Sequence, residues 1–326
     1  MSKVKNQHTV PQSYLRFFAD PQEKLFVFDK LGKKTFLSNV RNVAADRFFY
    51  DFPEEYSPSK HGFEEIPDQF VEKVLGEYDG RYPKQINNII STFNLSHPDK
   101  VWETPLFTKE NKVELAVLLS IQIFRTREFR DFLSQGQEKI TKMLIDRLMS
   151  NENPDYNPDA LKVEIKKDLL PIEQARFLID PEVVLEMTTT LMKHIWTVGV
   201  NLTDFPFYTS DNPVVKYANR EDPYRSFNGY GSEGIAIYYP LNSKFMLSLF
   251  EREYFEDAEI LEDYFLPIEN VEYVKHFNSL QISECQRQVF CREDKFEMAF
   301  EFCRMYPEAC KEDKHKISIY SMGREY

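Results

Sequence analysis

The stretch with the most chemical potential is residues 206–215, PFYTSDNPVV, in which two apolar, β-prone runs meet at a polar corner. Strand residues on both sides would hold the corner rigidly, and Pro213 removes a backbone donor there. We therefore expect the Asp211 carboxylate at a strand end, where it could orient or deprotonate a water molecule. The same pattern is typical of an ordinary turn, in which Asp and Asn side chains accept hydrogen bonds from backbone amides.

Two further polar residues stand in apolar or rigid surroundings and have side chains that do chemistry. His8 titrates near neutrality, so it could pass protons or bind a metal ion, or simply brace the helix that follows it. Arg125 lies in an apolar segment and could hold a phosphate or a carboxylate through two hydrogen bonds. A buried arginine otherwise needs a paired anion, and Asp211 or Glu77 could supply that carboxylate in a purely structural clip.

These parts suit the hydrolysis of a nucleic acid or a nucleotide-like substrate. In base excision, Asp211 would activate a water molecule at a flipped nucleoside. In phosphodiester cleavage, Asp211, Glu77 and His8 would hold a divalent metal ion. We therefore predict a catalytic set of His8, Asp211 and Glu77. The predicted substrate-binding residues, which include aromatic rings available for base stacking, are Gln12, Arg125, Arg127, Tyr14, Tyr208 and Asn212.

Composition narrows the classes of function. The 326 residues carry 41 basic and 53 acidic side chains, a formal charge of −12 that repels a nucleic-acid backbone at long range. Basic residues cluster locally at Arg125, Arg127 and Arg130 and at Lys33 and Lys34, so a basic groove for nucleic acid stays a candidate. Nucleotide-loop, dinucleotide-binding, serine-hydrolase and zincin signatures are absent, so no nucleotide cofactor motif is found and a divalent metal ion is the cofactor to consider.

The cysteines and the apolar pattern indicate a cytoplasmic protein. Cys285, Cys291, Cys303 and Cys310 lack the two-to-four-residue spacing of zinc knuckles, so we interpret them as reduced thiols. No segment resembles a signal peptide, and no run approaches the roughly 18 apolar residues of a membrane span, so we expect no membrane partner.

Apolar spacing predicts the helices, and β-prone runs predict the strands. The most important element is a long, buried helix over 109–133 that carries Gln122 and Arg125 on one face. An N-terminal hairpin should turn at Gly32 in the left-handed conformation. The other predicted helices start at Pro11 or lie within 63–93 (broken around Pro83), 182–196 and 271–285, and the predicted strands are 25–28, 35–37, 205–210, 213–218, 234–239, 244–250, 288–291 and 317–320.

Helices in the middle and strands at both ends predict an α+β fold. We expect a largely helical body with a small antiparallel sheet built from the N-terminal hairpin and the C-terminal strands. The chain should form a single α+β domain over 1–326, with two packed lobes as the alternative. These would be a hairpin plus helical lobe over 1–150 and a helix plus sheet lobe over 161–326, joined by the loop 151–160.

The order of motifs resembles the family catalogued as domain of unknown function 4238. The resemblance implies an intracellular microbial protein and implies no activity, since the family is named for lacking one. His8, Gln12, Arg125 and Asp211 match its motifs, and Glu77 lies in a helix that aligns loosely. The matching segments span most of the chain and are NQHTVPQSYLRFF (6–18), FVFDK (26–30), NVA (42–44) with FY (49–50), QIFRTR (122–127), FYTSDNPV (207–214) and YPLNS (239–243).

A second function fits the same residues, namely a non-enzymatic sensor or interaction protein in which the polar cluster is structural. Geometry distinguishes the two. In a hydrolase, His8 and Asp211 would line one open pocket, within hydrogen-bond reach or one bridging water of each other. In a binding protein they would be sealed in the core or lie far apart.

Overall fold

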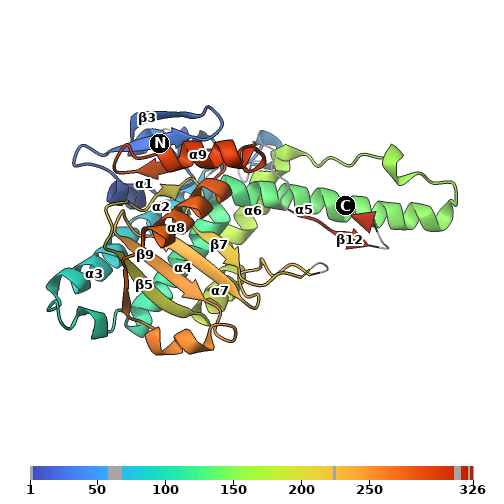
Figure 1. Ribbon diagram of the computed structural model, residues 1–326. Helices are drawn as coiled ribbons and strands as arrows, with labels where there is room; N and C mark the ends of the chain where they lie inside the picture. Colours follow the sequence, from blue (N-terminus) through green and yellow to red (C-terminus); the bar gives the residue numbers. More distant parts are fainter. Residues whose placement is uncertain (1–2, 58–67, 223–224, 312–316, 322–323, 326) are drawn as a thin grey trace.

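The computed structural model describes residues 3–57, 68–222, 225–311, 317–321 and 324–325. Helices pack around two main sheets, and the fold is α+β, as predicted from the sequence (Figure 1). Within the described part, no helix is both long enough and apolar enough to cross a membrane.

The larger sheet has five strands in the order β10-β5-β9-β8-β7, antiparallel throughout except for the parallel pair β10 and β5. Successive side chains of a strand point to opposite faces, and both faces of this sheet are buried. The run of β-branched and aromatic residues in these strands fits a sheet that is covered on both sides. The strands are β5 (Ile195–Asn201), β7 (Val215–Ala218), β8 (Ile235–Pro240), β9 (Phe245–Phe250) and β10 (Phe265–Ile268).

The smaller sheet joins the two ends of the chain in the order β3-β2-β11-β6. This confirms that the N-terminal hairpin pairs with C-terminal strands. Its turn differs from the prediction, because the left-handed residue is Lys33 (φ 47°) and not Gly32, whose amide donates to the Asp29 carboxylate. The strands are β2 (Lys24–Asp29), β3 (Lys34–Asn39), β6 (Thr209–Ser210) and β11 (Gln288–Cys291), and two small pairs are β1 (Asn6–His8) with β4 (Ala45–Arg47) and β12 (Tyr320–Ser321) with β13 (Arg324–Glu325).

The helices follow the apolar spacing, with two corrections. The long helix predicted over 109–133 is broken at Thr126, whose side chain caps the second helix by accepting from Phe129 N. The helix predicted over 182–196 ends at Met192, and β5 begins at Ile195. The helices are α1 (Gln12–Leu15), α2 (Phe70–Asp79), α3 (Tyr82–Leu95), α4 (Lys109–Arg125), α5 (Arg127–Glu152), α6 (Leu170–Ile179), α7 (Pro181–Met192), α8 (Val271–Glu284) and α9 (Glu297–Met305).

Helices cover both faces of the larger sheet. On one face, side chains such as Trp196 and Val198 share a core with α4 and α7. On the other face, the N-terminal part of α8 packs through Val274. The C-terminal part of α8 packs on the smaller sheet through Ile282, so that this one helix joins the two sheets.

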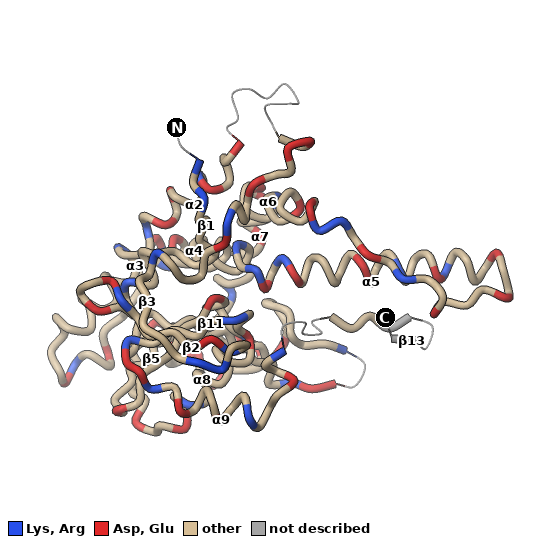
Figure 2. The backbone as a smooth tube through the Cα atoms, turned by 90° about the horizontal axis from the view of Figure 1, so that it is seen from above, with Lys and Arg blue, Asp and Glu red and all other residues tan. Residues whose placement is uncertain are grey.

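The helix α5 extends away from this body as an arm (Figure 1). Apolar side chains on it remain well exposed, among them Leu144 (50%) and Leu148 (63%). Acidic and basic positions both occur along it (Figure 2). Most of the candidate residues lie in the body, and Arg127 and Arg130 lie in the first turns of α5, where it leaves the body.

Candidate functional site

The Asp211 corner joins β6 to β11. The Asp211 carboxylate accepts backbone N–H bonds from Gln286, Arg287 and Gln288, each at 2.8 Å, and its own amide donates to the Gln288 carbonyl. Burial raises the pKa of the Asp211 carboxyl, and the three amide donors oppose that rise. Both carboxylate oxygens therefore accept from the backbone at the start of β11 and just before it, as in the ordinary turn that the sequence analysis gave as the alternative.

The rest of the corner is tied to α8. The Ser210 hydroxyl donates to Gln281 Oε1 at 2.7 Å, and Gln281 Nε2 donates to the Pro213 carbonyl at 2.9 Å. Asn212, a predicted substrate-binding residue, donates from Nδ2 to the Glu284 carbonyl at 3.2 Å. The corner thus fixes the C-terminal end of α8.

Arg125 is the most buried charged side chain of the candidate set, with 1% of the residue exposed. Its NH1 donates to Asp79 Oδ1 at 2.5 Å, and its NH2 donates to the His8 carbonyl at 2.6 Å. The sequence analysis offered Asp211 or Glu77 as the carboxylate partner of Arg125. The partner in the structure is Asp79. A buried arginine is stabilised by such a pair, because an unpaired charge in the interior costs several kcal/mol.

Asp79 and Glu77 lie on different faces of α2. Leu75 and Asp79, four residues apart, turn inward, whereas Glu77 is exposed. Glu77 therefore lies away from Arg125, and a catalytic role for it stays a prediction to which this placement lends no support.

His8 lies beside Arg125 and is almost closed off, with 8% exposed. Its Nδ1 is 3.4 Å from Gln12 Nε2, and its Nε2 has no hydrogen-bond partner among the described residues. Burial, and next the Arg125 charge, lower the pKa of His8, so the ring is neutral at physiological pH. A neutral imidazole with an open nitrogen could exchange a proton with a small molecule that reached it.

A hydrogen-bond network links the three segments that the sequence analysis singled out. Gln122 Nε2 donates to the Thr9 carbonyl at 3.1 Å, which ties α4 to the segment after His8. Thr9 N donates to Ala44 O at 2.8 Å, and Ala44 N donates to Gln288 Oε1 at 3.0 Å. Since Gln288 also donates to Asp211, the N-terminal segment, the arginine helix and the corner meet in one network.

Glu72 is a second titratable group near Arg125, and sequence reasoning missed it together with Asp79. Burial raises the pKa of Glu72 to about 7, although the Arg125 charge lowers it. Its Oε2 has no hydrogen-bond partner among the described residues. The signal for both acids was their spacing of seven on α2, which places them on one face of the helix.

Glu72→Gln should change how stability depends on pH. In the folded protein Glu72 keeps its proton up to a pKa of about 7, whereas a carboxyl in the unfolded chain loses it near ~4.3. The folded state thus binds the extra proton, and stability falls as pH rises through that window. The glutamine variant should exceed the wild type in stability at pH 7.5 by on the order of 1 kcal/mol, after allowance for solvent screening, and by less at pH 5. Urea unfolding at the two pH values measures this; an equal difference at both would mean that another group titrates.

The remaining predicted binding residues already have partners within the protein. Arg127 pairs with Asp46. The Tyr14 hydroxyl donates to the Pro240 carbonyl at 2.6 Å, and the Tyr208 hydroxyl donates to the Lys295 carbonyl. Both tyrosine rings are fully buried, which leaves them no face on which a base could stack.

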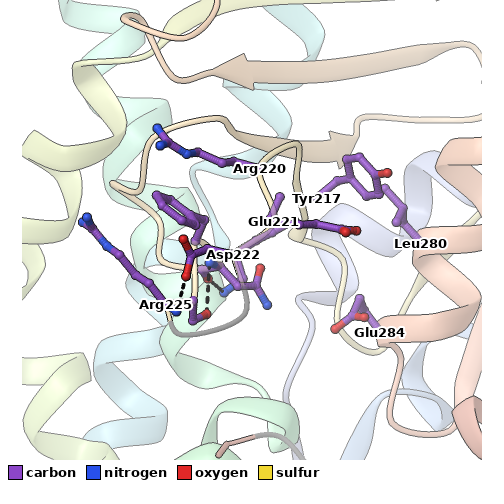
Figure 3. Close-up of a pocket in the computed structure, with 12 residues that line it drawn as sticks. Tyr217, Arg220, Glu221, Asp222, Arg225, Leu280 and Glu284 are labelled. Atoms are coloured by element: carbon purple, nitrogen blue, oxygen red, sulfur yellow. Dashed lines mark hydrogen bonds between the residues drawn. The ribbon is translucent and has the colours of Figure 1, made fainter.

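Two of the pockets on the described surface are considered as ligand sites, and neither is lined by His8 or Asp211. The larger has a volume of about 820 Å³ and lies between β7, the loop after it and the C-terminal half of α8 (Figure 3). Because Asn212 and Pro213 are bonded to that half of α8, the corner supports one wall of this pocket. The corner therefore supports the pocket through α8, whereas the Asp211 carboxylate does not line the pocket.

No metal-binding group of three or more His, Cys, Asp or Glu side chains occurs among the described residues. His8, Glu77 and Asp211 are thus not gathered as ligands of one divalent ion. The four cysteines, all buried, are free thiols. Burial raises the pKa of Cys291 and of Cys303 to about 12, so both stay protonated and unreactive.

Comparison with known proteins gives one match. A family model described as "Protein of unknown function (DUF4238)" matches residues 6–295. No curated protein and no solved structure gives a significant match. The matched range contains the N-terminal segment, the arginine helix, the corner and every residue that lines the larger pocket.

Proposed function

Because the chain belongs to the DUF4238 family, whose description names no activity, we propose its function from geometry: it is a non-enzymatic sensor that binds a ligand in its larger pocket. The observation that carries this proposal is that the reactive groups of the motifs already have structural partners. Asp211 is engaged by three backbone amides, and Arg125 by Asp79 and the His8 carbonyl. A catalytic base and a substrate clamp would need free hydrogen-bonding capacity.

The motifs in this proposal build the frame around the pocket. The polar network holds the N-terminal segment on α4, and the corner holds α8, one wall of the pocket. We place the protein in the cytoplasm, where its four buried cysteines would stay reduced.

A nucleic-acid groove at the central arginines receives no support from their contacts. Arg125 and Arg127 are paired with Asp79 and Asp46. Arg130 donates to the Phe49 carbonyl and lies over the Phe49 ring, 3.5 Å from its centroid. With these charges paired or stacked on a ring, the net charge of −12 would repel a phosphate backbone.

The test is incubation of the purified protein with single- and double-stranded DNA, RNA and modified-base DNA, with and without Mg²⁺ or Mn²⁺. Alkaline treatment afterwards reveals abasic sites. We expect no substrate to change. Cleavage or base release would contradict the proposal if it copurifies with the protein and is lost when a predicted catalytic residue is replaced in a variant that still folds.

The second candidate is a hydrolase of nucleic acid or a nucleotide-like substrate, of the base-excising or nuclease-like type, and one observation favours it. His8 and Glu72 both flank Arg125, and each has a buried atom without a partner among the described residues. A carboxyl with a pKa of about 7 and a neutral imidazole, each near the same arginine, are suitable as an acid and a base.

Glu72→Gln separates the two candidates, because this variant should fold at least as well as the wild type at neutral pH. Under the hydrolase candidate it should lose activity in the same substrate panel by a factor of about 100 or more. Under the sensor proposal it should leave ligand binding in the larger pocket unchanged, because Glu72 does not line that pocket. Glu77→Gln, on the exposed face of α2, is the matched control.

A further inference from the structure

We propose that the outer edge of β3 binds an acidic, extended peptide segment, which adds to the smaller sheet as a fifth strand. The proposal concerns a surface for a protein partner and does not depend on the larger pocket. It follows from the backbone groups, the exposed apolar side chains and the charge of the β3 edge.

β3 pairs with another strand on one side only. Its six residues lie opposite residues of β2, and no described strand pairs with its other side (Figure 1). In an antiparallel pair, the backbone groups of alternate residues point away from the partner strand. No described residue outside β2 forms a hydrogen bond with the backbone of residues 34–39. Such an edge fits an extended segment, because a strand matches its row of donors and acceptors.

Each face of β3 carries an exposed apolar side chain. Phe36 is 38% exposed and Leu37 is 48% exposed, and as consecutive strand residues they point to opposite faces. Phe36 lies opposite Val27, which belongs to the main core. Leu37 lies opposite Phe26, which packs against the core on the α9 side of the sheet. An added strand would place side chains beside Phe36 on one face and beside Leu37 on the other.

The exposed charges of the hairpin are all basic. Its single acidic residue within 24–41 is Asp29, which is 2% exposed and accepts from Arg287 Nε at 3.1 Å and from Arg287 NH2 at 2.8 Å. Lys33 and Lys34, where β3 begins, form no ion pair with any carboxylate in the described ranges. The hairpin edge is therefore a locally basic surface that complements carboxylates on an added strand. The exposed basic residues are Lys24, Lys33, Lys34 and Arg41.

The same charges argue against a second copy of the chain as the occupant of the edge. Two copies that paired through β3 would bring two basic edges together, and each copy carries a net charge of −12. Lysine on an edge strand is a common means of preventing such pairing. An acidic segment avoids this repulsion, because its carboxylates would pair with the lysines.

The alternation along β3 defines the segment that fits. Lys34 and Phe36 point to the same face, so the partner needs a carboxylate and an apolar residue two positions apart on that face. A second apolar residue should lie beside Leu37. The peptide TTVITEE meets these requirements when it runs antiparallel to β3, and EETIVTT meets them when it runs parallel.

Fluorescence anisotropy of both peptides, labelled with fluorescein, tests the proposal on the full chain. At least one should bind with a Kd below about 100 μM, and its counterpart with Gln in place of Glu should bind about fivefold more weakly. Lys33→Gln combined with Lys34→Gln should abolish that difference. Phe36→Thr combined with Leu37→Thr keeps the β propensity and should weaken both forms of the peptide about tenfold. The control is Ile260→Thr, at an 81% exposed side chain outside the hairpin, and it should change nothing.

Hydrogen exchange followed by mass spectrometry locates the bound peptide, which should slow exchange of the amides of residues 34–39. The proposal would be overturned if neither acidic peptide bound, if the Phe36→Thr and Leu37→Thr double variant bound as tightly as the wild type, or if exchange slowed only in other segments. Sedimentation velocity tests the alternative occupant. A dimer that this double variant dissociates would assign the edge to a second copy and would also overturn the proposal.

Discussion

Asp79→Ala should lower the free energy of unfolding by about 3 kcal/mol, because it leaves the Arg125 guanidinium buried without its carboxylate. The pair is suited to this effect, since only 1% of the arginine side chain and 27% of the aspartate side chain are exposed. Urea unfolding at pH 7, followed by circular dichroism, measures the change.

The control is two residues away on the same helix. Glu77→Ala removes an exposed carboxylate of the same charge and should change stability by less than about 0.5 kcal/mol. If the two variants were equally stable, Asp79 would not be what stabilises the buried arginine.

Asp211→Asn should cost about 2–3 kcal/mol, since it replaces a charged acceptor of three backbone N–H bonds by a group with one acceptor oxygen. The new NH₂ group would face at least one backbone N–H donor. The amides of residues 286–288 should also exchange hydrogen faster in the variant, which mass spectrometry can follow.

Asp204→Asn is the matched change, at an exposed aspartate in the loop before the corner. It should be neutral within about 0.5 kcal/mol. A stable Asp211→Asn protein that had lost an activity present in the wild type would instead assign Asp211 to catalysis.

Much of the architecture was predictable, because it follows from local sequence patterns. The spacing of apolar residues located α4, and the β-prone runs on either side of residues 30–34 located the hairpin that joins the C-terminal strands. The break at Thr126 was missed because apolar spacing continues across it into Phe129. The strand β5 was missed because Ile195 extends the periodicity of the preceding helix.

The site was predictable only in part, because its partners are set by tertiary contacts. The sequence identified Arg125 as a residue that needs an anion, yet Asp79 lies 46 positions away and looks no different from Glu77. Likewise, the corner was recognised as either a catalytic or a turn motif. Its contacts are decided by Gln286, Arg287 and Gln288, which approach from the segment that begins β11. The local spacing of residues around Arg125 and Asp211 does not reveal which distant residues will contact them.

The most direct test of the central claim, that the motif residues stabilise the fold as structural partners, is a double-mutant cycle on Arg125→Met and Asp79→Ala. Each single variant leaves one charge buried alone, whereas the double variant removes both. We predict a coupling energy of at least about 2 kcal/mol in urea unfolding, with the double variant no less stable than the worse single one. A coupling energy below about 0.5 kcal/mol would contradict the claim.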